Sequence, residues 1–234
     1  MKNTIIIFLI FFVSSANGQE NNISVVYGLN IENEVGLFNN NATLKNLFLK
    51  SMIDCKKLNF QLIITQNGSK FYNEKKLEID GNLGSKSFTL SMGNYTGMIY
   101  SIKGKVLKQS PYLGENIYGE EVFKSDWNLT SETKLIDNYL CYKATSSNKV
   151  VYGDKVWNHP VVAWYCPKLP FPYGPIGYGN LPGLILELQV RNAIYGVKSI
   201  NLNSSFDFDV KFLDKIKILT QKQIEEAFTK QEGY

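Results

Sequence analysis

Apolar and polar residues alternate along most of this chain, which is the pattern of strands with one buried face. Turn residues, mainly Asn and Gly, separate the alternating segments at short intervals, and strands do not alternate with long helices. The segments expected to be strands are residues 24–31, 58–72, 85–92, 96–109, 115–129, 138–146, 160–166, 184–190 and 194–202. Consecutive short strands of this kind predict an antiparallel meander.

The segment 42–56 follows helical spacing instead. Its apolar positions recur three and four residues apart, at Leu44, Leu47, Phe48, Met52 and Cys55. This spacing places them on one side of an amphipathic helix. Asn40 or Asn41 is expected to be the N-cap, since an Asn side chain accepts hydrogen bonds from the first free backbone N–H groups of a helix.

A second helix is expected over residues 220–231 at the C-terminus. Thr220 and Gln223 form a capping-box pattern, and the apolar residues that follow lie on one stripe. The chain is therefore predicted to be mainly β, at the margin of the α+β class. We expect the meander to curl into an open β-barrel or half-barrel built from a single domain, residues 19–234.

The first eighteen residues have the composition of a secretory signal peptide. Lys2 precedes a continuous apolar run from Ile5 to Val13, and small residues at Ala16 and Gly18 predict cleavage before Gln19. The apolar run is too short to span a bilayer, and no cysteine near the cleavage site indicates a lipid anchor. We expect export to the periplasm or beyond, with no transmembrane segment in the mature chain.

The charge of the chain argues against one class of function, nucleic-acid binding, and its composition agrees with a strand-rich fold. The 234 residues carry a net charge of +4, and Lys and Arg are spread along the chain without a basic cluster. Nucleic-acid binding is therefore not expected. Fourteen Tyr and fourteen Phe agree with a strand-rich fold whose core and loops are packed by aromatic rings.

Catalytic motifs are missing from the sequence. The single histidine, His159, precedes a proline in the polar segment 147–159, which is expected to be a loop. No nucleophile elbow, phosphate-binding loop or zinc motif occurs, so we expect no metal, no cofactor and no enzyme activity. Paired carboxylates of a hydrolase remain the least favoured alternative. The candidates are Glu120, Glu121, Glu187, Asp207 and Asp209.

Prolines concentrate just before residue 183. The Pro-rich segment, residues 167–182, cannot be a helix or a central strand and is expected to be a stiff excursion between two strands. Pro182 and Gly183 fit the central positions of a type II turn. Beyond this turn, alternation predicts a core-facing row and a solvent-facing row. The first is Leu184, Leu186, Leu188 and Val190, and the second is Ile185, Glu187, Gln189 and Arg191.

The corner NLPGLI, made of Asn180, Leu181, Pro182, Gly183, Leu184 and Ile185, resembles the motif that names the GLPGLI family of exported bacterial proteins. The resemblance includes SDWNLTSETKLIDNYLCYKA and VVAWYCPKLPFPYGP, and it covers residues 127–203 clearly. It implies an exported, mostly β protein of the bacterial cell envelope, with no established activity to transfer. By looser analogy, the strand pattern is similar to the open β-barrels of periplasmic lipoprotein carriers.

The chain departs from the family pattern at two glycines and in one loop. Asn180 and Asn138 stand where the family has glycine, and Asn is the residue other than glycine that best tolerates left-handed backbone. We therefore expect both positions to serve backbone conformation. The segment 147–159 is longer than the family's loop.

Strand register predicts one disulfide. If the strands on either side of residues 147–159 pair with each other, Cys141 and Cys166 lie opposite each other and Cys55 is left over. An oxidising compartment permits such a bridge.

Three functions remain open, from different classes. The first is a non-catalytic binding or carrier protein for an apolar or peptide ligand, with the Pro-rich segment at the mouth of an aromatic-lined cavity. Its expected contact residues are Trp164, Tyr165, Tyr173 and Tyr178. The second is an envelope assembly component that contacts an outer-membrane protein partner. The third is the hydrolase with paired acids.

Overall fold

The computed structural model describes residues 22–74, 83–152 and 155–231. The expected signal peptide, residues 1–18, lies outside them. Within the described residues, twelve strands form one sheet. The strands are β1 Asn22–Ile31, β2 Asn59–Thr65, β3 Gly68–Asn73, β4 Ile99–Ile102, β5 Lys105–Gln109, β6 Ile117–Val122, β7 Asn128–Ile136, β8 Tyr139–Tyr152, β9 Lys155–Cys166, β10 Leu184–Val190, β11 Ala193–Ser204 and β12 Lys217–Leu219.

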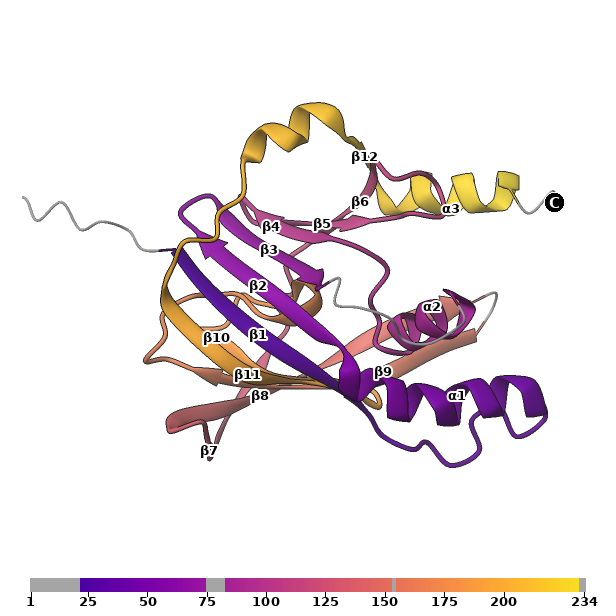
Figure 1. The fold of residues 1–234 in the computed structure, drawn as a ribbon, viewed down its shortest axis with the longest axis horizontal. Helices are drawn as coiled ribbons and strands as arrows, with labels where there is room; N and C mark the ends of the chain where they lie inside the picture. Colours follow the sequence, from indigo (N-terminus) through magenta and orange to yellow (C-terminus); the bar gives the residue numbers. More distant parts are fainter. Residues whose placement is uncertain (1–21, 75–82, 153–154, 232–234) are drawn as a thin grey trace, which may run out of the picture.

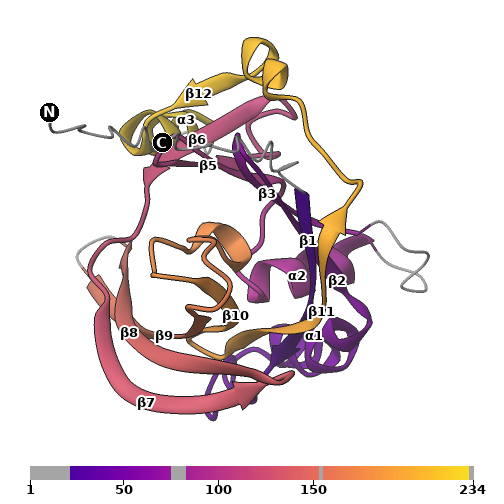
Figure 2. The same ribbon diagram turned by 90° about the vertical axis from the view of Figure 1, so that its left-hand side faces the viewer.

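The sheet consists of two antiparallel meanders joined by β1. Strands β2 to β6 form one meander and β7 to β11 the other, and β1 pairs with both β2 and β11. Strand β12 lies parallel to β6. The sheet curls around the segment that precedes β10, and it does not close, since β12 and β7 remain its two edges (Figure 2). The predicted class, mainly β with an open curled sheet, is confirmed.

Two helices lie where their spacing predicts them. Helix α1, Ala42–Asp54, continues into a 3-10 turn, η1 Cys55–Lys57, and helix α3 is Gln221–Gln231. Of the two cap candidates, Asn41 is the N-cap, because its side chain accepts a hydrogen bond of 3.0 Å from the backbone N–H of Leu44. The capping box of α3 is also formed, since the backbone N–H of Thr220 donates to Gln223 Oε1 at 2.9 Å.

The strand predicted over residues 85–92 is wrong. These residues belong to helix α2, Leu83–Met92, which lies beside α1 at one end of the molecule (Figure 1). Ser85 and Thr89 are buried one turn apart, where small side chains let the helix pack closely, and the Thr89 hydroxyl donates to the Ser85 carbonyl. Phe88 packs against Phe38. These contacts prevail over the period-two pattern of the sequence.

Strands β2 and β4 are buried on both faces of the sheet. The larger core cluster fills the inside of the curl and includes Ile64, whereas its neighbour Ile63 belongs to a second cluster on the opposite face. Tyr100 and Phe212 stack in that second cluster with ring centroids 3.9 Å apart. Phe212 lies on η3, Val210–Lys215, so the segment between β11 and β12 covers the outside of the sheet.

The predicted loop over residues 147–159 is also wrong. Strands β8 and β9 continue through it as a long hairpin, in which Asn148 pairs with His159 and Tyr152 with Lys155. The polar residues that suggested a loop, such as Asn158, are exposed on the hairpin arms. Backbone hydrogen bonds pair the two arms along their length, and an antiparallel ladder needs no apolar side chain on its solvent face.

Candidate functional site

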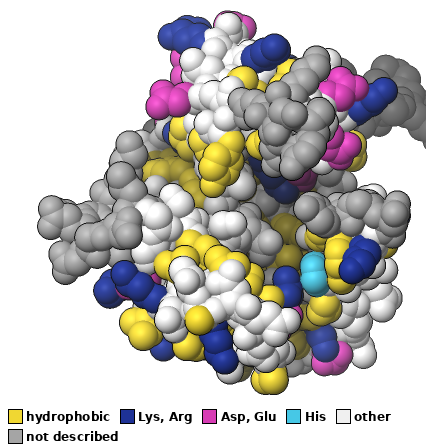
Figure 3. Space-filling view, turned by 90° about the vertical axis from the view of Figure 1, so that its right-hand side faces the viewer, with side chains coloured by type: hydrophobic (Ala, Val, Ile, Leu, Met, Phe, Trp, Pro, Cys, Tyr) yellow, Lys and Arg dark blue, Asp and Glu magenta, His cyan; other side chains and the backbone are white. Residues whose placement is uncertain are grey.

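A cavity of ≈ 1090 Å³ opens between the two arms of the curled sheet. Its walls come from β5, β6, the segment after β6, the end of α2, β8, the Pro-rich segment and α3. The side of the molecule seen in Figure 3 is hollowed, with apolar and charged side chains around the hollow. Segments that are distant in the sequence thus supply one site.

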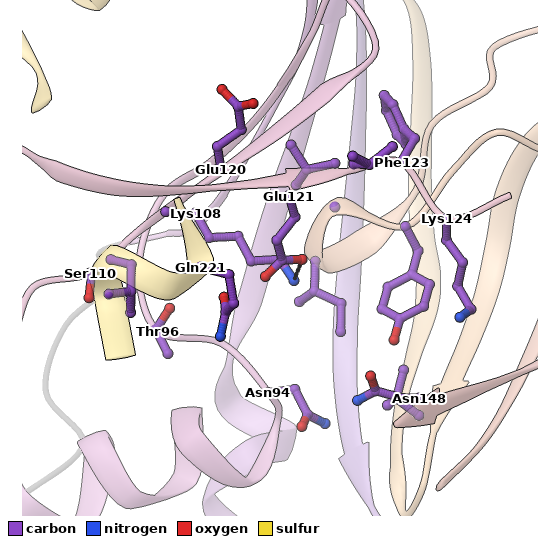
Figure 4. A pocket seen from close by; sticks show the side chains of 18 of the residues that line it. Asn94, Thr96, Lys108, Ser110, Glu120, Glu121, Phe123, Lys124, Asn148 and Gln221 are labelled. Carbon is purple, nitrogen blue, oxygen red and sulfur yellow. Dashed lines mark ion pairs between the residues drawn. The ribbon is translucent and has the colours of Figure 1, made fainter. Parts of the chain in front are cut away.

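One wall of this cavity, formed by β5 and β6, carries an ion pair. Lys108 Nζ on β5 lies 2.6 Å from Glu121 Oε2 on β6, and Figure 4 shows both side chains among the labelled lining residues. The two side chains are 32% and 45% exposed, so a ligand in the cavity can reach both charges. Glu120 points away from them and pairs with Lys105 at 3.0 Å.

A second ion pair lines the cavity in the segment that follows β6. Lys124 Nζ lies 3.0 Å from Asp126 Oδ1 and donates 2.7 Å to the carbonyl of Ser147. The hydrogen bond from Lys124 lowers the pKa of the Asp126 carboxyl. Lys124 therefore ties the segment after β6 to β8.

Amide side chains face the space between the ion pairs. Asn94, just after α2, and Asn148, on β8, both line the cavity and point towards its interior (Figure 4). Asn94 has a φ of +56° and ends α2 as a left-handed cap, with the backbone N–H of Tyr95 donating to Leu90. An Asn amide offers one acceptor and two donors, so these side chains can pair with either kind of group on a ligand.

The Pro-rich segment forms the floor of the cavity through a strained turn. Its 3-10 turn, η2 Pro175–Gly177, contains Ile176 at φ +46°, a conformation that β-branched residues rarely adopt. The next residue must be glycine, because a Cβ on Gly177 would lie 2.6 Å from Val106 on β5. The strained turn brings Ile176 and Tyr178 to the cavity wall. Burial, followed by the charges of Glu121 and Asp126, raises the pKa of Tyr178 to about 12.

The NLPGLI corner holds this turn against the opposite wall. Asn180 has a φ of +61° and Asn138 a φ of +65°, which confirms the left-handed backbone predicted at both positions. Asn180 also uses its side chain, which donates 3.3 Å to the Lys124 carbonyl. Trp127 Nε1 donates 2.9 Å to the Gly179 carbonyl. The corner is therefore fastened to the segment that follows β6.

The turn type predicted for the corner is wrong. The backbone N–H of Gly183 donates 2.7 Å to the Leu181 carbonyl, which closes a γ-turn at Pro182. The N–H that would close a type II turn, that of Leu184, donates instead to the carbonyl of Leu169 at 2.9 Å. Contacts with the Pro-rich segment thus replace the expected local hydrogen bond.

The core-facing row after the corner is buried as predicted, but Ile185 is buried too. The prediction that Ile185 faces solvent is wrong because the Pro-rich segment folds over it. Its N–H donates 3.0 Å to the Tyr173 carbonyl, and β10 has a register shift between Ile185 and Glu187. Glu187 is partly exposed and pairs with Lys134 at 2.7 Å.

The four aromatic residues predicted to contact one ligand do not converge. Tyr178 lines the large cavity, Tyr173 lines a second cavity of ≈ 570 Å³, and Tyr165 lines a third of ≈ 470 Å³. Trp164 lines none of the three. Its ring lies under the ammonium group of Lys134, which is 4.6 Å from the ring centroid.

The predicted strand register brings two cysteines together. Tyr142 pairs with Tyr165, so the next position along the hairpin places Cys141 opposite Cys166. Both are buried free thiols in the structure, as is Cys55. Burial, and then the neighbouring Cys166, raise the pKa of the Cys141 thiol to about 12. The disulfide remains a prediction.

The other carboxylates considered for catalysis have structural partners. Asp207 accepts a hydrogen bond from the N–H of Phe208, and Asp209 accepts one from the N–H of Lys211. His159 lies on β9, opposite Asn148. Within the described ranges, no cluster of three His, Cys, Asp or Glu side chains is arranged to hold a metal ion. No helix in the same ranges is long and apolar enough to cross a membrane.

Sequence reasoning missed most of the large cavity's lining. Glu121 was named only as a carboxylate candidate, and Lys108, Asn94, Asn148 and Phe123 were not selected. One signal was available for Lys108. Alternation puts it on the same face of β5 as the buried Val106, so a charge stands where an apolar side chain is expected.

Part of the chain matches a known protein family. Residues 153–187, which include the whole NLPGLI corner and strand β9 before it, match the model of a family described as "Protein of unknown function (Porph_ging)". No curated protein matches the sequence.

Two solved structures are similar in fold. PNGF-II in space group P21 superposes with a TM-score of 0.53 and 15% identity, covering 88% of this chain and 33% of that one. PNGF-II in space group C2 gives a TM-score of 0.52 and 15% identity over 88% of this chain and 32% of the other. The chain thus spans about a third of the PNGF-II chain, and at this identity the likeness concerns the fold alone.

Proposed function

We propose that this chain is an exported, non-catalytic binding module of the bacterial cell envelope, of the GLPGLI type, and that its large cavity takes a peptide ligand. The single observation that carries the proposal is the Lys108–Glu121 ion pair inside a cavity of ≈ 1090 Å³. A cation and an anion side by side suit a ligand that itself carries both charges. The export part of the proposal rests on the signal-peptide pattern of residues 1–18.

The polar lining favours a peptide over an apolar ligand. Each peptide unit presents one N–H donor and one carbonyl acceptor, and the amides of Asn94 and Asn148 offer the complementary pair. Tyr178 and Phe123 add aromatic surface for side chains of the ligand. Ligand pockets typically combine such apolar surface with a few placed polar groups.

The ion pairs formed by the cavity's acids favour binding over hydrolysis. A hydrolase with paired carboxyls needs one acid that holds its proton near neutral pH. Glu120, Glu121 and Asp126 are instead each within 3.0 Å of a lysine ammonium. The pKa of Asp126 is lowered, which is the wrong direction for a general acid.

Native mass spectrometry of the protein purified from its own cell envelope tests this function. We expect a non-covalently bound peptide that is lost from Asn148→Leu and retained by Asn158→Leu. Both substitutions lie on the β8–β9 hairpin, but Asn158 is exposed and does not line the cavity. An empty wild-type protein, or a bound species that Asn148→Leu retains, would contradict the proposal.

A second candidate function is an envelope component that binds a protein partner. Leu129 and Leu135 on the edge strand β7 are 53% and 71% exposed, and Val156 and Trp157 on the β8–β9 hairpin are 52% and 41% exposed. Exposed apolar side chains on a sheet edge favour association with another chain. In the same spectrum, a stoichiometric protein in place of a small ligand would support this function.

A further inference from the structure

A second cavity lies on the other side of the Pro-rich segment and has a different chemistry. Its volume is ≈ 570 Å³, and it lies between the start of β1, the end of β2, β11 and the Pro-rich segment. Most of its surface comes from apolar side chains, among them Ile23, Ile64, Leu169, Phe171 and Leu202. Ile23, Ile64 and Leu169 are each only 4% exposed.

Tyr173 and Phe123 separate this cavity from the large one. Tyr173 lines the apolar cavity, Phe123 lines the large one, and their ring centroids are 6.2 Å apart. The two cavities share no lining residue. A ligand of the apolar cavity is therefore distinct from the peptide proposed above.

The cavity is open to solvent on one side, and its lining is mostly apolar. Water against such a surface finds few hydrogen-bonding partners, so its displacement by an apolar body is favourable. Two polar side chains of the lining, Asn22 and Thr65, form hydrogen bonds with Phe206 and Asn67 within the chain, and a third, Gln66, is exposed. The cavity is suited to an apolar body.

One charged side chain, that of Lys168, lies at the opening of the apolar cavity. Lys168 is the only charged residue of the lining, its side chain is exposed, and it has no ion-pair partner within the described residues. A single cation beside an apolar cavity complements a single anion on an apolar chain. Lys168 also borders the third cavity, so the location of the ligand must be tested separately from its charge.

We propose that the apolar cavity binds a single-chain amphiphile with a carboxylate head, a fatty-acid-type ligand. The chain lies between the Pro-rich segment and the β1–β2 end of the sheet, and the carboxylate meets Lys168. Leu202, which is 44% exposed, marks the opening.

Isothermal titration calorimetry with octanoate, decanoate and dodecanoate, each below its micellar concentration, measures the contribution of the chain. We expect roughly fourfold tighter binding for each added methylene. Decanoate should bind a few-fold more tightly than decanol, as expected for a partly exposed ion pair. Lys168→Gln should remove that difference, and Lys50→Gln, an exposed lysine on α1 that lines no cavity, should keep it.

The substitution Leu202→Trp tests whether the ligand binds in the apolar cavity. A larger side chain at the opening should abolish decanoate binding, whereas Leu135→Trp, at an exposed position on β7, should leave it unchanged. The proposal is overturned if no alkyl carboxylate binds, if affinity does not rise with chain length, or if Leu202→Trp binds normally. Equal affinity for decanol, or tighter binding of decyl phosphate, would overturn the carboxylate assignment.

Discussion

Gly183 is the residue of the NLPGLI corner with the least freedom to change. Its φ is +155°, and a Cβ there would lie 2.2 Å from the Cys166 carbonyl oxygen and 2.8 Å from the nitrogen of Pro167. Both obstacles are backbone atoms, so a rotamer change cannot relieve the clash. The close approach explains why this position needs glycine, whereas Asn180 can replace the glycine of the family motif.

Gly183→Ala should lower the free energy of unfolding by roughly 3 kcal/mol or more, since it adds a backbone clash to a left-handed conformation. Urea denaturation measures the change. Gly104→Ala is the matched control, because Gly104 has a φ of +78° and a Cβ added there would meet no atom within 4 Å. It should cost about 1 kcal/mol. Equal losses in the two variants would contradict the role of the clash.

Cys141 and Cys166 should form a disulfide when the protein is purified without reductant. They are adjacent on paired strands, and a bridge that closes this hairpin should stabilise the fold by roughly 3 kcal/mol. Peptide mapping without reduction should recover the two cysteines in one crosslinked species. Cys55→Ala should leave the crosslink intact, and recovery of both Cys141 and Cys166 as free thiols would refute it.

The three helices differ in whether local sequence signals or tertiary packing determine them. The spacing and caps of α1 and α3 are strong enough to be read from the sequence, whereas α2 carries a period-two pattern and becomes helical through its packing. Its stop signal was available in the sequence, because Gly93 and Asn94 follow Met92 directly and Asn94 adopts the left-handed cap. The strand-like alternation of residues 85–92 led to the prediction of a strand in spite of this stop signal.

Asn41→Ala should lower the free energy of unfolding by about 1 kcal/mol, because the backbone N–H of Leu44 loses its acceptor. Asn40→Ala is the control, since the exposed Asn40 precedes the cap and both residues were candidates on sequence grounds. Thermal unfolding of the two variants compares them. A larger loss for Asn40→Ala would place the N-cap one residue earlier.

Buried tyrosines form part of both core clusters of the molecule. Burial raises the pKa of Tyr95, Tyr100 and Tyr178 to about 12. The fully buried hydroxyls of Tyr27 and Tyr195 donate 2.7 Å to the carbonyls of Ile185 and Gly93. Several tyrosines therefore keep their protons in the folded protein at a pH where the unfolded chain releases them.

Stability should therefore fall at alkaline pH. The contribution of each such tyrosine is complete below its unfolded pKa of 10.0 and is lost as the pH rises towards about 12. Urea denaturation across this range should give a steep decline above about pH 10. Tyr178→Phe should make the decline shallower, and Tyr112→Phe, at a side chain 69% exposed, should not. A level profile would contradict the role of burial.

Local sequence accounts for the strand-rich class, the two capped helices and the left-handed asparagines, because each depends on a period, a cap or a backbone preference within a few residues. The register of Cys141 with Cys166 spans the long β8–β9 hairpin, and it followed from the sequence only on the condition that these two strands pair. The helical conformation of residues 85–92 and the covering of Ile185 arise from tertiary packing. The tertiary structure also brought Lys108, Glu121, Asn94 and Asn148 to one cavity. Those outcomes depend on how the curled sheet places distant strands together, and no local pattern encodes that distance.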